Sequence, residues 1–251
     1  MAAAVTTTSS TTSTLSPRGV RIVGAVFVAF AALFIAVGIG IAATQGGKLR
    51  GFQAVPATVT GTGVVSQRGS KGGTTYAPRV DFTYQVAGAT HVAHTPFPLA
   101  IYGSGDWAQE LVASYHVGQQ LTAWYNPAAP GEAYLEHKVD IFPYCFILFP
   151  MVHVAVGLAI MLFSGRSPGA PLSAASKAAR LGAIAGCWIT VGGLAGWHFA
   201  RIGGDFSGWN LGIFAIYAVP GVGLALACLG YARAAARAAP AENSYAVPGP
   251  E

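Results

Sequence analysis

Four apolar runs in this chain are each long enough to cross a lipid bilayer as a helix. A bilayer core about 30 Å thick is crossed by about 20 apolar residues of α-helix. The runs are Ile22 to Ala43, Ile141 to Phe163, Leu181 to Ala200 and Trp209 to Gly230. Only 9% of the 251 residues are charged, whereas a soluble domain usually carries about 25%. The sequence therefore predicts an α-helical integral membrane protein with about four transmembrane helices and the lipid bilayer as its main partner.

Two of these runs carry features that bear on their conformation. The first has 22 residues, whereas the apolar part of a signal peptide has about 7–15, so we expect an uncleaved helix. The second contains Pro143 and Pro150, which remove backbone donors and are expected to kink the helix.

The third run contains glycines at spacings that let a neighbouring helix approach closely. These helix-packing candidates are Gly182, Gly186, Gly192 and Gly196. They are expected to support contacts between helices, and a homo-oligomer or an envelope protein partner is left open.

The basic residues predict how the chain is oriented, because cytoplasmic loops carry an excess of lysine and arginine. Arg18 and Arg21 precede the first run, Arg166, Lys177 and Arg180 lie between the second and third, and Arg233 and Arg237 follow the fourth. Both termini are therefore expected in the cytoplasm. The formal net charge of +5 is interpreted as this topology signal, so no nucleic-acid partner is expected.

A polar stretch between the first two runs is expected to form a small, strand-rich α+β domain outside the membrane. Apolar and polar residues alternate in Val80 to Val86, which indicates a strand, and Ala87-Gly88 suits a hairpin turn. A short helix is expected to begin at Asp106 as its N-cap and to end at Gly118. The expected core comprises Phe82, Tyr84, Leu111, Tyr115, Leu121 and Tyr125.

The expected organisation follows from these segments. It comprises a disordered N-terminal tail at 1–19, transmembrane helices at 20–44, 139–163, 181–200 and 209–231, an extracytoplasmic domain at 45–138, a cytoplasmic loop at 164–180, a short outer loop at 201–208 and a disordered cytoplasmic tail at 232–251.

The polar domain carries a recognisable pattern. Val80 to Val86 followed by Gly88 resembles a "Y-x-Y-x-V-x-G" core, and the run from Tyr115 through Tyr125-Asn126-Pro127 to Pro130 resembles a "y-p-x-G-x-x-V-x-V-y-Y-N-P-x-x-P" signature. Both resemble the bacterial DUF3592 family. The resemblance covers about residues 50 to 160, implies a bacterial plasma membrane protein with flanking spans, and supplies no activity or functional residues.

Candidate chemistry is sparse. His153, an ionisable residue within the second run, is the one weak functional candidate; otherwise it is expected to make an interhelical hydrogen bond. His91 and His94 lie three apart on a predicted strand and so point to opposite faces, which disfavours a shared metal. We find no catalytic motif and predict no cofactor, no metal site and no enzyme.

Three functional hypotheses remain. The leading one is a non-enzymatic binding, sensing or envelope-complex module presented outside the membrane. The alternatives are a small transporter or channel subunit and a membrane-bound enzyme. A binding module should show an exposed edge strand or an apolar groove, a transporter a polar path between helices, and an enzyme a cleft with clustered titratable groups.

Overall fold

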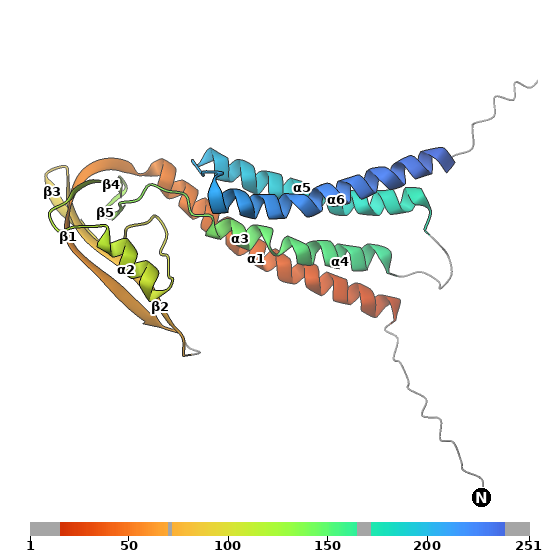
Figure 1. Cartoon of the computed structure of the whole chain (residues 1–251), viewed down its shortest axis with the longest axis horizontal. Coiled ribbons are helices and arrows are strands. Elements are labelled where there is room, and N and C mark those ends of the chain that lie inside the picture. Colours follow the sequence, from red (N-terminus) through yellow and green to blue (C-terminus); the bar gives the residue numbers. More distant parts are fainter. Residues whose placement is uncertain (1–15, 70–71, 165–171, 239–251) are drawn as a thin grey trace, which may run out of the picture. The chain divides into compact units, whose positions relative to one another are not determined.

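The computed structural model describes residues 16–69, 72–164 and 172–238. Within them, four helical segments are long and apolar enough to cross a membrane (Figure 1). They are α1 (Pro17–Gly51), α3 (Phe142–Leu148) together with α4 (Met151–Phe163), α5 (Ala174–Arg201) and α6 (Gly208–Ala238). The expected four apolar helices are thus confirmed.

These helices extend beyond the apolar runs. Residues 17–19, 174–180 and 232–238 are helical, although the sequence predicted tail or loop there. Helix α1 also continues to Gly51, so the polar domain begins later than residue 45. A helix needs apolar residues only where lipid surrounds it, which is why hydropathy underestimates its length. The predicted disorder of residues 1–15 and 239–251 lies outside the described residues.

The two prolines of the second span behave differently. The helix is interrupted between Leu148 and Met151, where Phe149 and Pro150 separate α3 from α4, as expected from the missing donor of Pro150. Pro143, in contrast, lies in the first turn of α3. Amide groups there have no partner within a helix in any case, so Pro143 causes no kink and that part of the prediction is wrong.

The described chain divides into two compact units. One comprises residues 36–147 and 193–214 and contains all five strands: β1 (Gln53–Arg68), β2 (Thr74–Val86), β3 (Ala89–Ala93), β4 (Gln120–Asn126) and β5 (Ala129–Tyr134). They form one antiparallel sheet in the order β3-β2-β1-β4-β5. The predicted strand-rich α+β domain is present in this unit.

The sheet curls until its two edge strands meet at one end. Thr95, just after β3, forms an isolated bridge with Tyr134 at the end of β5. The Pro96 carbonyl accepts hydrogen bonds from Leu135 N at 3.1 Å and from Glu136 N at 2.7 Å. These contacts satisfy backbone groups that edge strands would otherwise leave unpaired.

The domain core lies on the inner face of this sheet. Alternation along β2 buries Val80, Phe82 and Tyr84, and helix α2 (Gly105–Ala113) adds Val112. Tyr115 is also buried in this core, while Leu111, Leu121 and Tyr125 pack against it partly buried. The expected core is therefore confirmed.

The ends of α2 differ from the prediction. Ser104 is the N-cap, because its hydroxyl accepts a hydrogen bond from Trp107 N at 3.3 Å. The predicted N-cap, Asp106, lies two residues later, within the first turn of the helix. The helix ends at Ala113 with Ser114 as C-cap. Gly118, at φ +86°, instead belongs to the following turn, where its amide donates to Val59 O at 2.8 Å.

A second apolar cluster joins the other face of the sheet to helix ends of the same unit. Tyr134 and Trp124, which are paired across β4 and β5, pack with Leu49 near the end of α1 and with Ile202 after α5. Phe52 stacks on Tyr134 with ring centroids 5.3 Å apart. The domain is therefore packed against these helix ends and is more than a tethered module.

Candidate functional site

A groove of about 450 Å³ lies between β2 and the segment 94–102 that follows β3. Both ends of this segment are held against β2. Val80 N donates to His94 O at 3.1 Å, and Tyr76 and Gly103 exchange backbone hydrogen bonds of 3.1 and 2.8 Å. Between these points the segment departs from the strand, so that Ala77, Pro78 and Arg79 border the groove.

The groove has mainly apolar walls and polar groups at one end. The apolar lining is formed by Val65, Pro96, Phe97, Leu99, Ile101 and Tyr102, and the cationic or ionisable lining by Arg79 and His94. An apolar hollow with a few convergent polar groups is the usual form of a ligand site.

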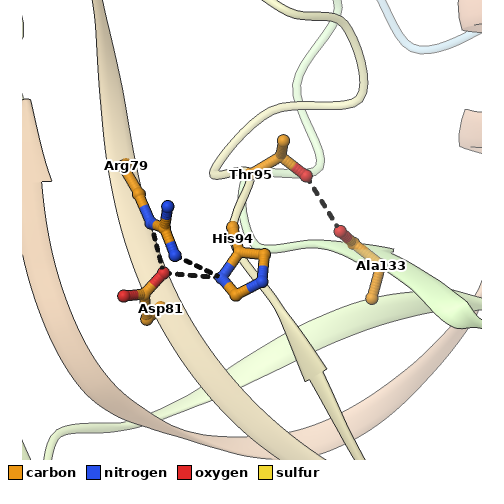
Figure 2. A network of polar contacts seen from close by, with 5 residues as sticks. All are labelled: Arg79, Asp81, His94, Thr95 and Ala133. Carbon is orange, nitrogen blue, oxygen red and sulfur yellow. Dashed lines mark hydrogen bonds and ion pairs between the residues drawn. The ribbon is translucent and has the colours of Figure 1, made fainter. Parts of the chain in front are cut away.

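The polar end is a three-residue network (Figure 2). Arg79 Nε donates to Asp81 Oδ1 at 2.8 Å, and His94 Nδ1 lies 2.6 Å from the same oxygen. Arg79 Nη2 is 3.3 Å from His94 Nδ1. Nearby, Thr95 Oγ1 donates to Ala133 O at 3.1 Å, which holds the start of segment 94–102 against β5.

The geometry assigns the proton on His94. A carboxylate only accepts hydrogen bonds, so the short contact with Asp81 places a proton on Nδ1. This nitrogen then cannot accept from Arg79 Nη2. The terminal nitrogens of Arg79 therefore retain hydrogens that no described residue takes up, while Asp81 orients the guanidinium through Nε.

Electrostatics keep Asp81 ionised. Burial alone would raise the pKa of this carboxyl, but hydrogen bonds from Arg79 and His94, with the charges of both, outweigh it and hold the pKa below its ordinary value of 3.8. Gly61 lies opposite Asp81 at a bulge in β1, and a Cβ there would be 3.3 Å from Asp81 Oδ2. The glycine thus makes room for the carboxylate.

The register of the β2–β3 hairpin brings Asp81 and His94 together, and the turn residues that set this register are visible in the sequence. The turn at Ala87-Gly88 has positive φ at both residues, as a two-residue hairpin requires. It pairs Val86 with Ala89 and Phe82 with Ala93, which brings Asp81 beside His94. His91 instead stacks on Tyr84, with ring centroids 5.7 Å apart.

Segment 94–102 also reaches the helix ends of this unit. Phe97, Leu99 and Ile101 line a second hollow of about 190 Å³ together with Gln45, Lys138 and Asp140. Gln45, on α1, is fully buried. Its side-chain amide donates from Nε2 to Asp140 O at 3.1 Å and accepts from Asp140 N at 3.2 Å. This pair of bonds ties α1 to the chain just before α3.

His153 lies in the other unit, on α4. Its ring faces Phe27 and Phe30 of α1, with centroids 5.9 and 5.7 Å away. Its Nδ1 is buried and has no hydrogen-bond partner among the described residues. The expected interhelical hydrogen bond is thus not formed by this nitrogen.

The four packing candidates of α5 have different surroundings. A Cβ at Gly192 would overlap the ring of Tyr217 on α6, whereas a Cβ at Gly186 would meet no described atom within 4 Å. A Cβ at Gly182 would lie 3.3 Å from Cys228 Sγ, and one at Gly196 would lie 3.7 Å from the ring of Phe214.

A closer helix crossing, between α1 and α4, has no repeat that marks it in the sequence. A Cβ on Gly24 would be 2.7 Å from Gly157 O, and a Cβ on Gly157 would be 2.6 Å from Gly24 O. Here α1 and α4 meet backbone to backbone. Each helix contributes one glycine at this point, so no G-x3-G repeat marks it in the sequence.

The motif residues of the domain are also brought together by the fold. Tyr84 OH donates to Pro130 O at 2.5 Å. Asn126 Oδ1 accepts from Ala128 N at 3.0 Å, and its Nδ2 donates to Glu132 Oε2 at 3.0 Å. The alternating strand and the Asn-Pro turn are thus parts of one structural unit.

Residues 55–140 match DUF3592, a domain of unknown function. The resemblance seen in the sequence is confirmed for this part of the chain. No curated protein matches the chain. The DUF3592 segment begins within β1 and ends at Asp140, just before α3. It includes the groove, the Arg79–Asp81–His94 network and both edges of the sheet.

The described residues do not place three His, Cys, Asp or Glu side chains where they could hold one metal ion. The DUF3592 groove offers apolar contact along its walls and charge-assisted hydrogen bonds from Arg79.

Proposed function

We propose that this chain is a multi-pass protein of a bacterial plasma membrane whose DUF3592 domain lies outside and acts as a non-enzymatic binding module. The groove between β2 and segment 94–102 carries this proposal. Its volume of about 450 Å³ lies within the range of small-molecule sites, about 300–1,000 Å³. Its walls are apolar, and Arg79 and His94 converge at one end.

The orientation is supported by the distribution of basic residues. Arg18 and Arg21 lie at the start of α1, Lys177 and Arg180 near the start of α5, and Arg237 in the last turn of α6. In a chain with four spans these three helix ends lie on the same side of the membrane. The side with more lysine and arginine near the membrane is the cytoplasmic side.

Reporter fusions test the orientation. An alkaline phosphatase fusion at Gly72, in the turn between β1 and β2, should be active, because this enzyme folds only outside the cytoplasm. A fusion at Ser173, before α5, should be inactive. Activity at Ser173 without activity at Gly72 would reverse the proposed orientation.

Groove filling tests the binding site. Ala77 lines the groove, whereas Ala113 is exposed at the end of α2. After crosslinking in cells, the parent chain and Ala113→Trp should carry the same bound species, and Ala77→Trp should lose it. If Ala77→Trp folds and retains the species, the groove is not the site.

A second candidate function rests on His153. A buried imidazole nitrogen without a partner inside a membrane helix is a functional candidate, and it favours a transporter or channel subunit. Proton flux into proteoliposomes that contain the full chain should then fall in His153→Phe. Equal flux in parent, variant and empty liposomes would eliminate this candidate.

A further inference from the structure

The apolar wall of the groove continues to the ends of two candidate membrane helices. Phe97, Leu99 and Ile101 line both the groove and the second hollow. The second hollow contains Gln45 of α1 and Asp140, two residues before α3. One short segment therefore presents apolar side chains from the helix ends to the polar network.

The second hollow lies beside the residues at which the apolar runs of these two helices end. Gln45 comes two residues after the apolar run that ends at Ala43, and Phe142 begins α3. Tyr102 is the last residue of segment 94–102, and it is 50% exposed. Aromatic residues with a polar tip are typical of the membrane interface. This position beside the ends of two apolar helices favours a ligand that comes from the lipid layer.

The other end of the groove offers a site for an anion. Asp81 binds Arg79 through Nε, and His94 uses its Nδ1 proton on Asp81, so the terminal Nη1 and Nη2 groups of Arg79 are available. Two parallel N–H groups suit a phosphate or a carboxylate better than a neutral headgroup.

We propose that the groove binds an anionic lipid from the outer leaflet, with an acyl chain along Phe97, Leu99 and Ile101 and the anionic group at the terminal nitrogens of Arg79. This inference rests on the proposed binding function and gives that function its ligand class. The groove takes one lipid out of the layer and presents its headgroup beside the Arg79–Asp81–His94 network.

Photocrosslinking identifies the class of ligand. A benzophenone amino acid at Tyr102 of the full chain, in cells, reports on the groove, and the same group at Val117, which is 70% exposed in a turn, reports on random contacts. A lipid adduct at Tyr102 in excess of Val117 supports the inference. A protein adduct instead overturns it but leaves the binding function intact. No excess adduct of any kind refutes both.

Headgroup preference tests the anion site. The full chain in nanodiscs is titrated with pyrene-labelled phosphatidylglycerol and with pyrene-labelled phosphatidylcholine. The parent should prefer phosphatidylglycerol, and Arg79→Gln should lose about tenfold in that preference, as expected for one charge-assisted contact. Arg68→Gln, at the exposed end of β1, should keep it.

Leu99→Gln tests the contact with the acyl chain without changing the charge at Arg79. This substitution should lower the affinity for both lipids equally, because the acyl chain loses its contact with Leu99 whichever headgroup the lipid carries. Equal affinity of the parent for the two lipids, or an unchanged preference in a folded Arg79→Gln, would overturn the proposed anion site. Thermal melts of each variant establish that it is folded.

Discussion

Trp188 and Tyr217 each donate a hydrogen bond to the other's backbone carbonyl, across the contact between α5 and α6. Trp188 Nε1 lies 2.9 Å from Tyr217 O, and Tyr217 OH lies 2.6 Å from Trp188 O. Their rings stack with centroids 4.7 Å apart and an interplanar angle of 13°. Both side chains are buried, so one pair supplies polar and apolar contact at the same place.

We predict that Tyr217→Phe lowers the free energy of unfolding of the full chain by about 0.6 kcal/mol and by no more than about 1.7 kcal/mol, the range for hydrogen bonds between membrane helices. The phenyl ring keeps the stacking and loses only the hydroxyl. Denaturant titration in detergent micelles measures the change. A Trp188→Phe, Tyr217→Phe double-mutant cycle should show coupling, and strictly additive losses would contradict the paired arrangement.

Two glycines of α5 give a matched test of helix contact. Gly192→Ala should destabilise the chain by about 1–3 kcal/mol, because the new Cβ would overlap the Tyr217 ring. Gly186→Ala should instead be neutral or stabilising by up to about 1 kcal/mol, because its Cβ meets no described atom within 4 Å and alanine favours helix. The same denaturant titration compares the free energies of unfolding of the two variants and the parent.

The result for the two glycines also bears on oligomerisation. If Gly186→Ala destabilises the chain as much as Gly192→Ala, then Gly186 contacts something outside one chain, and a second copy is the simplest source. Size-exclusion profiles of the two variants would distinguish that case from a contact within the chain.

Local patterns in the sequence predict much of this fold, since each depends on neighbouring residues. Hydropathy locates the four helices, and the alternation of Val80 to Val86 locates β2. Segment 94–102 is different: its path depends on bonds from His94 and Gly103 to residues of β2 that are distant in sequence. The groove was therefore not predictable from composition or period. The pairing of Asp81 with His94, in contrast, was predictable, because the Ala87-Gly88 turn sets the register of the hairpin.

The start of α2 shows the limit of local signals in another way. Ser104 and Asp106 are both good N-cap residues, and only the hydrogen bond to Trp107 N distinguishes them. We predict that Ser104→Ala lowers the stability of the domain by about 1 kcal/mol, since the cap bond is lost. Ser104→Asp should restore most of it, because aspartate caps equally well. Thermal melts of the full chain compare the three, and no loss in Ser104→Ala would favour Asp106 as the cap.

His137 makes the junction between sheet and helix ends sensitive to pH. Its Nδ1 lies 3.0 Å from Tyr134 OH, and its ring centroid is 3.9 Å from that of Trp124. Partial burial lowers the pKa of His137 below its ordinary value of 6.5, because the charged form is the more costly to desolvate. Burial raises the pKa of Tyr134, so its hydroxyl stays protonated; this hydroxyl also lies 3.4 Å from Lys48 O.

The sign of the pH effect follows from the lowered pKa. The unfolded chain binds the proton more readily than the folded chain, so the stability that neutral His137 contributes is present above about pH 6.5 and is lost as pH falls through the folded-state pKa. Melting temperatures of the parent and of His137→Gln, measured from pH 8 to pH 5, should therefore converge or cross as the pH falls. His116→Gln, which alters an exposed turn residue, should run parallel to the parent. A constant difference between parent and His137→Gln across this range would show that His137 does not titrate against the folded state.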